Sequence, residues 1–103
     1  MRKNEEGIIQ LQIIHYLRMK GCPVGKIKTK GSFTKGKFLK DPTQWTGLPD
    51  LLAFVPEMIF LEVKRPKGKQ SPNQEDFQEL CKKAGQPYYV VHSVAEVEQF
   101  LPK

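Results

Sequence analysis

The chain has 103 residues, of which 39% are hydrophobic, and its 17 lysine and arginine residues against 11 acids give a net charge of +6. This length allows one compact domain over residues 1–103 and excludes two, while the positive excess favours a polyanionic partner, although it could serve solubility alone. No apolar run approaches the roughly eighteen residues of a membrane span, and no signal-peptide block opens the chain, so we expect a cytoplasmic protein without a membrane partner.

A helical pattern opens the chain and is stopped by Gly21 and Pro23. Its apolar positions recur at helical spacing: Ile9, Ile13, Tyr16 and Leu17. Glu6 shares their buried face, whereas Glu5 is rotated by roughly 100° and should meet solvent. Glu6 and Gln10, one helical turn apart, could reach a metal directly or through its waters, or they could simply be solvated at the first turn.

A loose alternation from Val24 to Lys30 predicts a half-exposed strand, and Gly31, Gly36 and Pro42 then predict a long loop. Loops of such length in a compact domain are usually functional or disordered, so this one is a candidate nucleic-acid arm. Trp45 could stack on a base or sugar, or pack against the domain. Through this region six lysines follow one another without an intervening acid: Lys26, Lys28, Lys30, Lys35, Lys37 and Lys40.

The segments Asp50 to Val55 and Met58 to Lys64 predict a β-hairpin that turns near Pro56-Glu57. Both segments are apolar runs of the kind that fill buried strands, so each charge inside them needs an explanation. The charged positions are Asp50, Glu62 and Lys64.

The length of the hairpin loop decides whether these charges meet. Directly opposed residues of an antiparallel pair point to the same face, so a two-residue loop would set Asp50 opposite Val63 and separate the carboxylates. A three-residue loop would set Asp50 opposite Glu62 or Lys64 and bring all three groups together. A shared metal site therefore predicts the odd loop, or a bulge or bend near Pro49 with the same effect.

Two carboxylates and a lysine in this arrangement suit phosphodiester hydrolysis, because a divalent metal can neutralise a nonbridging oxygen and activate a water. Hard ions such as Mg²⁺ take oxygen ligands, for which Asp50, Glu62 and the Val63 carbonyl are candidates. Lys64 lies two residues after Glu62 and hence on the same strand face, where it could orient the water or stabilise developing charge. The alternative is an ordinary ion pair of Lys64 with Glu62 or Asp50.

A basic turn over 66–70 precedes a second helix with Ser71 at the N-cap, a proline at the first position and Gln74 at the third. Gln74 could reach back to the N-cap amide or contribute to the site. The expected inner face of this helix, which ends at Gly85, is Phe77, Leu80, Cys81 and Ala84. Basic residues of the turn and its flank are candidate DNA contacts: Arg65, Lys67 and Lys69.

The last elements are a short buried strand over Tyr88 to Val91 and a helix that repeats the capping-box pattern in Ser93 to Glu96. The apolar side of that helix is Val94, Val97, Phe100 and Leu101. The predicted order is helix, three strands, helix, strand, helix.

The cysteines and histidines suggest no metal or disulfide framework. Cys22 and Cys81 share no close spacing with each other or with His15 and His92, so free buried thiols and structural or surface histidines are expected.

Four segments carry a more specific signal: Glu6 to Gln10, Gly47-Leu48-Pro49-Asp50-Leu51, Leu61-Glu62-Val63-Lys64-Arg65-Pro66, and Gly68-Lys69-Gln70-Ser71-Pro72-Asn73-Gln74. Together they closely resemble the VRR-NUC family, the virus-type replication-repair nucleases of the PD-(D/E)xK superfamily. The resemblance implies an α/β fold with a restriction-endonuclease-like αβββαβ core, in which a mixed central sheet is flanked by helices. It also implies an endonuclease that depends on Mg²⁺ or Mn²⁺ and needs no small-molecule cofactor.

The resemblance assigns roles to individual residues. Asp50, Glu62 and the Val63 carbonyl would bind the metal, Lys64 would be the catalytic lysine, Glu6 would match the family's first-helix glutamate, and Gln74 its glutamine near the site. Stand-alone members of this length occur in phages and prophages, resemble Holliday-junction resolvases and tend to form homodimers, so branched DNA and a second copy are the expected partners.

Two alternatives remain open from the sequence. One is a nuclease that acts on flaps, ends or linear duplex DNA, and the other is a non-catalytic nucleic-acid binding module. Such a module would bind DNA equally well with and without metal and would never cleave it.

Overall fold

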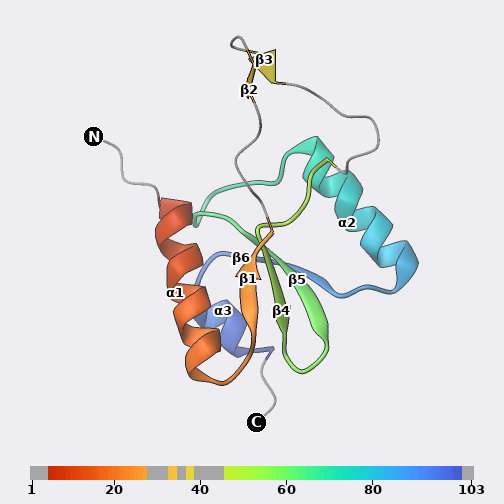
Figure 1. Cartoon of the computed structure of the whole chain (residues 1–103). Coiled ribbons are helices and arrows are strands. Elements are labelled where there is room, and N and C mark those ends of the chain that lie inside the picture. Colours follow the sequence, from red (N-terminus) through yellow and green to blue (C-terminus); the bar gives the residue numbers. More distant parts are fainter. Residues whose placement is uncertain (1–4, 28–32, 35–36, 39–45, 101–103) are drawn as a thin grey trace.

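The computed structural model describes residues 5–27, 33–34, 37–38 and 46–100, with residues 33–34 and 37–38 described as backbone only. Its elements are α1 (Glu5–Met19), β1 (Val24–Lys26), β2 (Phe33–Thr34), β3 (Lys37–Phe38), β4 (Leu51–Phe54), β5 (Met58–Val63), α2 (Pro72–Ala84), β6 (Tyr88–Val91) and α3 (Val94–Glu98). The main sheet has the order β1-β4-β5-β6, and only its last pair is parallel. Helices α1 and α3 lie on one side of this sheet and α2 on the other (Figure 1). The predicted mixed sheet flanked by helices is confirmed.

Helix α1 ends where the sequence predicts. Gly21 adopts a positive φ of 81°, and the N–H of Cys22 returns to the Leu17 carbonyl at 2.8 Å, which closes the helix. Glu5 is exposed and Glu6 half-buried, in line with their predicted rotation about the helix axis. The helix contributes three fully or nearly buried side chains to the core: Ile13, Ile14 and Leu17.

The hairpin of β4 and β5 has the odd loop that a shared site requires. Leu51 pairs with Leu61 and Phe54 with Met58, so the three residues 55–57 form the loop. Continued by one step, this register sets Asp50 opposite Glu62 on one face of the sheet. Because side chains alternate along a strand, that face is the one opposite to Leu51 and Leu61.

The two faces of the sheet have different chemistry. The face toward α1 and α3 is an aliphatic core built from Ile13, Ile14, Leu17, Val24, Leu51, Ala53, Val55, Ile59, Leu61, Val63, Val91 and Val97. The face toward α2 is aromatic: the ring of Phe77 lies 5.8 Å from that of Phe60 and 6.3 Å from that of Tyr88, centroid to centroid. These contacts fix α2 above β5 and β6, which is where Glu62 emerges.

Helix α2 has the predicted start, but its inner face differs from the prediction. The buried residues are Gln74, Phe77 and Cys81, whereas Leu80 is 46% exposed and Ala84 is also exposed. Around the helix axis, Leu80 lies about 100° from Cys81 and therefore points away from the buried face. Gln74 lies at the opposite edge of that face.

The carboxyl-terminal elements differ from the prediction in two respects. Only Val91 of β6 is buried, because β6 is an edge strand and Tyr89 remains 36% exposed. The Ser93 hydroxyl caps α3 by accepting from the Glu96 N–H, but the Glu96 carboxylate accepts from the N–H of His92 at 2.9 Å rather than from the N-cap amide. The capping box of α3 is therefore only half formed.

The long segment between β1 and β4, predicted to be a loop, contains the short hairpin of β2 and β3. Residues 28–32, 35–36 and 39–45 of this segment, including Trp45, lie outside the described residues, and so does Leu101.

Cys22 and Cys81 are free thiols, as predicted. Cys81 is buried as predicted, whereas Cys22 is only half-buried. Within the described part of the chain, no helix has the length and apolar character needed to cross a membrane.

Candidate active site

Asp50 is held at the start of β4 by backbone contacts on both sides. Its carbonyl accepts from the N–H of Ile27 at 2.9 Å, and its carboxylate oxygen Oδ2 accepts from the N–H of Val63 at 2.8 Å. The side chain is buried beside a fully buried Pro49. In an extended strand the N–H and C=O of one residue point to the same side, so we expect the Val63 carbonyl on the side of Asp50.

Glu62 is fully buried, and two donors contact its Oε2 atom. The Lys64 ammonium lies 3.2 Å away, and the Gln74 side-chain amide donates a hydrogen bond to the same oxygen. The ion pair that the sequence offered as the alternative to a metal site is thus present. Buried ion pairs are weak contributors to stability, because desolvation offsets the Coulomb attraction. The ion pair alone therefore does not account for the burial of Glu62.

Gln74 performs both of the roles that the sequence left open. Its Oε1 accepts from the backbone N–H of Ser71 at 2.9 Å, while the Ser71 hydroxyl accepts from the Gln74 backbone N–H at 3.3 Å, which completes a capping box. Its Nε2 meanwhile donates to Glu62. One side chain therefore joins the start of α2 to the acidic residue of β5.

Gly47 lets the segment before Asp50 pack directly against the first turn of α2. It has a positive φ of 73°, and a β-carbon at this position would lie 2.1 Å from the Asn73 carbonyl oxygen and 2.8 Å from the Gln74 nitrogen. Only glycine accommodates both the backbone conformation and this approach. Gly47 thereby places Gln74 within reach of Glu62.

Tyr88 is a neighbour of the site that the sequence did not indicate. Its hydroxyl accepts from the Gln70 side-chain amide at 3.3 Å, which ties β6 to the segment before α2. Burial raises the pKa of Tyr88, and the nearby Glu62 carboxylate raises it further. The phenol is therefore neutral at physiological pH and available as a hydrogen-bonding group.

The donor set fits a divalent cation. Asp50 and Glu62 supply two oxygen ligands and a charge of −2, of which the Lys64 ammonium offsets one unit, and the Val63 carbonyl is expected beside them. Within the described ranges there is no group of three His, Cys, Asp or Glu side chains that could hold a metal, so the structure does not group a third acid such as Glu6 with Asp50 and Glu62.

Glu6 is placed differently from the other candidate ligands. It lies half-buried in the first turn of α1, which packs on the sheet face opposite to α2. None of the contacts described above joins it to Asp50 or Glu62. Its participation stays a prediction.

The basic residues divide into two groups. Arg65, Lys67 and Lys69 are exposed on the turn between β5 and α2, which the Gly68 N–H closes onto the Arg65 carbonyl at 2.8 Å. This turn directly follows Lys64 and so adjoins the site. Lys37 lies in β3 as described backbone. The other candidate lysines of the arm lie outside the described residues: Lys28, Lys30, Lys35 and Lys40.

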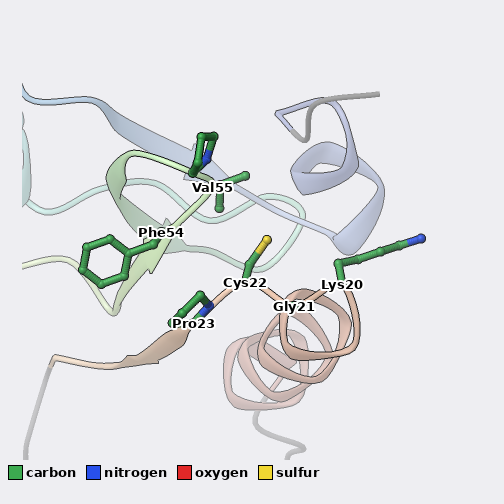
Figure 2. A pocket seen from close by; sticks show the side chains of 7 residues that line it. Lys20, Gly21, Cys22, Pro23, Phe54 and Val55 are labelled. Atoms are coloured by element: carbon green, nitrogen blue, oxygen red, sulfur yellow. The ribbon is translucent and has the colours of Figure 1, made fainter.

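A separate hollow of about 450 Å³ lies at the far end of the β4–β5 hairpin. Figure 2 shows the Cys22 side chain between the end of α1 and Val55, with the Lys20 side chain extending away from it. The hollow has no acid among its lining residues, which are Lys20, Gly21, Cys22, Pro23, Phe54, Val55 and Pro56. It is therefore not a second candidate for a metal-binding centre.

Comparison with known proteins agrees with this geometry. The sequence model of the VRR-NUC domain matches residues 36–95, a span that includes Asp50, Glu62, Lys64 and Gln74. A solved structure of a VRR_NUC domain is 27% identical, with 94% of each chain covered and a TM-score of 0.69. A second, a VRR_NUC domain protein, is 15% identical, with 97% of this chain and 90% of its own covered and a TM-score of 0.62, which supports the fold alone. No curated protein sequence matches.

Fold and site together define a small α/β domain of nuclease type, with its paired acids and lysine at one end of a hairpin. The chain belongs to the VRR-NUC family. Its function is accordingly that of a nuclease, and its substrate is nucleic acid.

Proposed function

We propose that this chain is a divalent-metal-dependent, structure-selective DNA endonuclease that acts as a homodimer on branched DNA, in the manner of a Holliday-junction resolvase. The observation that supports the metal-dependent chemistry is the three-residue loop of the β4–β5 hairpin. Its register, continued by one residue beyond the Leu51–Leu61 pair, would set Asp50 opposite Glu62, and Lys64 lies 3.2 Å from Glu62. Buried acids in this arrangement favour a cation as their shared partner.

The chain's own residues have separable roles in this proposal. Asp50, Glu62 and the Val63 carbonyl would hold Mg²⁺ or Mn²⁺, which when bound neutralises a nonbridging phosphate oxygen and lowers the pKa of water. The Lys64 ammonium, 3.2 Å from Glu62, lies where it can stabilise negative charge that develops on the phosphate. Gln74 holds Glu62 in one orientation through its hydrogen bond.

The proposed dimer is the consequence of the proposed substrate, a four-way DNA junction. The chain carries one copy of the acidic pair, whereas resolving a four-way junction takes two matched incisions. A two-fold substrate is naturally met by two subunits related by a two-fold axis. The exposed Arg65, Lys67 and Lys69 beside the site would contact the phosphate backbone.

Cleavage assays with the protein alone test the proposal. Labelled four-way junction, flap and linear duplex should be incubated with Mg²⁺, Mn²⁺ or excess chelator, and sedimentation should be measured in parallel. We expect metal-dependent nicking of the junction in preference to the duplex, and a sedimenting dimer. Cleavage in chelator would contradict metal dependence. Preferential cutting of flaps or ends would contradict the four-way junction as substrate. Junction resolution by a monomer would contradict the requirement for a dimer. Metal-independent binding without cleavage would indicate a binding module.

Charge reversal on the turn beside the site should weaken DNA binding. With Lys67→Glu and Lys69→Glu combined, affinity should fall on every DNA structure, and the slope of log affinity against log salt should flatten by about one unit for each phosphate that the turn no longer neutralises. The matched control is Lys82→Glu with Lys83→Glu, an equal change in charge at the far end of α2. Equal effects of the two pairs would mean that net charge, rather than this turn, governs binding.

A further inference from the structure

We propose that Ser71 is a positioning residue of the active site, because its backbone N–H fixes the side-chain amide of Gln74 so that the amide's donor faces Glu62. The inference rests on the proposed metal-dependent function and extends it to a residue outside the acidic pair. Two contacts of one buried amide carry it: Ser71 N–H to Oε1 at 2.9 Å, and Nε2 to the Glu62 carboxylate.

The two ends of a glutamine amide are chemically opposite, since the oxygen only accepts and the nitrogen only donates. With Oε1 on the Ser71 N–H, the nitrogen must face Glu62. The reversed amide would set its oxygen against the carboxylate and its NH₂ against the Ser71 N–H, two repulsive contacts in a side chain that is only 5% exposed. The main chain at Ser71 therefore selects the amide orientation that supports Glu62.

The start of α2 is itself held in place, so the oriented Gln74 amide stays within reach of Glu62. Gly47 packs against the backbone of Asn73 and Gln74, so the helix cannot move toward the segment before Asp50. Ser71 has φ −76° and ψ 163°, and its hydroxyl accepts from the Gln74 N–H. The Ser71 hydroxyl thus caps the helix, whereas the Ser71 N–H orients the Gln74 side chain toward the site. These two functions can be separated by mutation.

Ser71→Ala and Ser71→Pro make this separation. Alanine removes the hydroxyl and keeps the N–H, whereas proline removes both and suits the observed φ and the proline that follows. Calorimetric titration with Mn²⁺ alone should show affinity about tenfold or more weaker for Ser71→Pro than for Ser71→Ala, the size expected for groups that orient metal ligands. Ser93→Ala, which removes the equivalent hydroxyl cap of α3, is the matched control and should bind Mn²⁺ like wild type.

A second measurement needs no variant at position 71. In NMR titration of the wild type with Mg²⁺, the Ser71 backbone N–H and the Gln74 side-chain NH₂ should shift together, while the Ser93 N–H should not. Gln74→Met is similar in size and adds no charge, but it removes both the acceptor for Ser71 and the donor to Glu62, so it should weaken Mn²⁺ binding about as much as Ser71→Pro.

The outcomes separate this inference from the proposed function. Wild type that binds Mn²⁺, together with Ser71→Pro that binds it as well as Ser71→Ala, would overturn the positioning role alone. An unshifted Ser71 amide in the Mg²⁺ titration would do the same if the proline variant fails to fold. Wild type that neither binds Mn²⁺ nor cleaves DNA would overturn the metal-dependent function and this inference with it.

Discussion

Asp50→Asn should slow metal-dependent DNA cleavage by a factor on the order of a hundred or more while leaving DNA affinity nearly unchanged. Asparagine keeps an oxygen that can accept from the Val63 N–H, so the 2.8 Å contact that anchors the hairpin can persist. The substitution instead removes one of the two negative charges proposed to hold the cation. The phosphate contacts proposed for the basic turn would position the substrate without this charge.

Single-turnover cleavage of a labelled junction and equilibrium binding in chelator measure the two effects separately. Asp76→Asn is the matched control, because Asp76 is an exposed acid on α2 and the same change of charge is made away from the sheet. Parallel losses of binding and cleavage in Asp50→Asn would point to a damaged fold. Undiminished turnover by Asp50→Asn would show that Asp50 is not required for cleavage.

Gly47→Ala should lower the free energy of unfolding by roughly 2–5 kcal/mol, the sum of a left-handed alanine and an overpacked contact. The φ of 73° already disfavours any β-carbon, and the 2.1 Å approach to the Asn73 oxygen requires the backbone of α2 to shift. Such a shift would also draw Gln74 away from Glu62. We therefore expect the fraction that remains folded to cleave DNA more slowly than wild type.

Gly85→Ala separates the two causes. Gly85 caps α2 with a φ of 74°, yet a β-carbon there would meet nothing within 4 Å, so only the conformational cost of about 1–2 kcal/mol applies. Denaturant unfolding monitored by circular dichroism gives both values. If the two variants lose equal stability, the close contact of Gly47 with α2 contributes nothing.

The strands and caps were accessible from sequence because their signals are local. Apolar runs marked β4 and β5, and the Ser71 and Gln74 pattern marked the start of α2. Local sequence signals could not decide whether the hairpin loop has two or three residues, since a turn at Pro56-Glu57 suits both lengths equally. The hypothesis that the two acids share a cation predicted the three-residue loop, and the structure has that loop.

Features that depend on tertiary packing escaped the sequence. The apolar pattern predicts Leu80 on the buried face of α2, yet in the structure Gln74 lies on that face and contacts Glu62. The capping-box pattern predicts a bond from the Glu96 carboxylate to the N-cap amide, yet the carboxylate contacts the N–H and ring of His92. Gly47 stood in a recognisable motif, but nothing local reveals that a helix backbone would touch it. Each case needed the position of a distant segment.

The order in which the site assembles during folding follows from its placement on a single hairpin. Asp50 and Val63 are only 13 residues apart and are joined through a three-residue loop, so this pair can form on the microsecond timescale of isolated hairpins. Gln74 arrives only when α2 docks on the aromatic face. If the two acids bind a cation as proposed, the hairpin alone can bring them together, whereas the orientation of Glu62 by Gln74 requires that α2 has packed on the sheet.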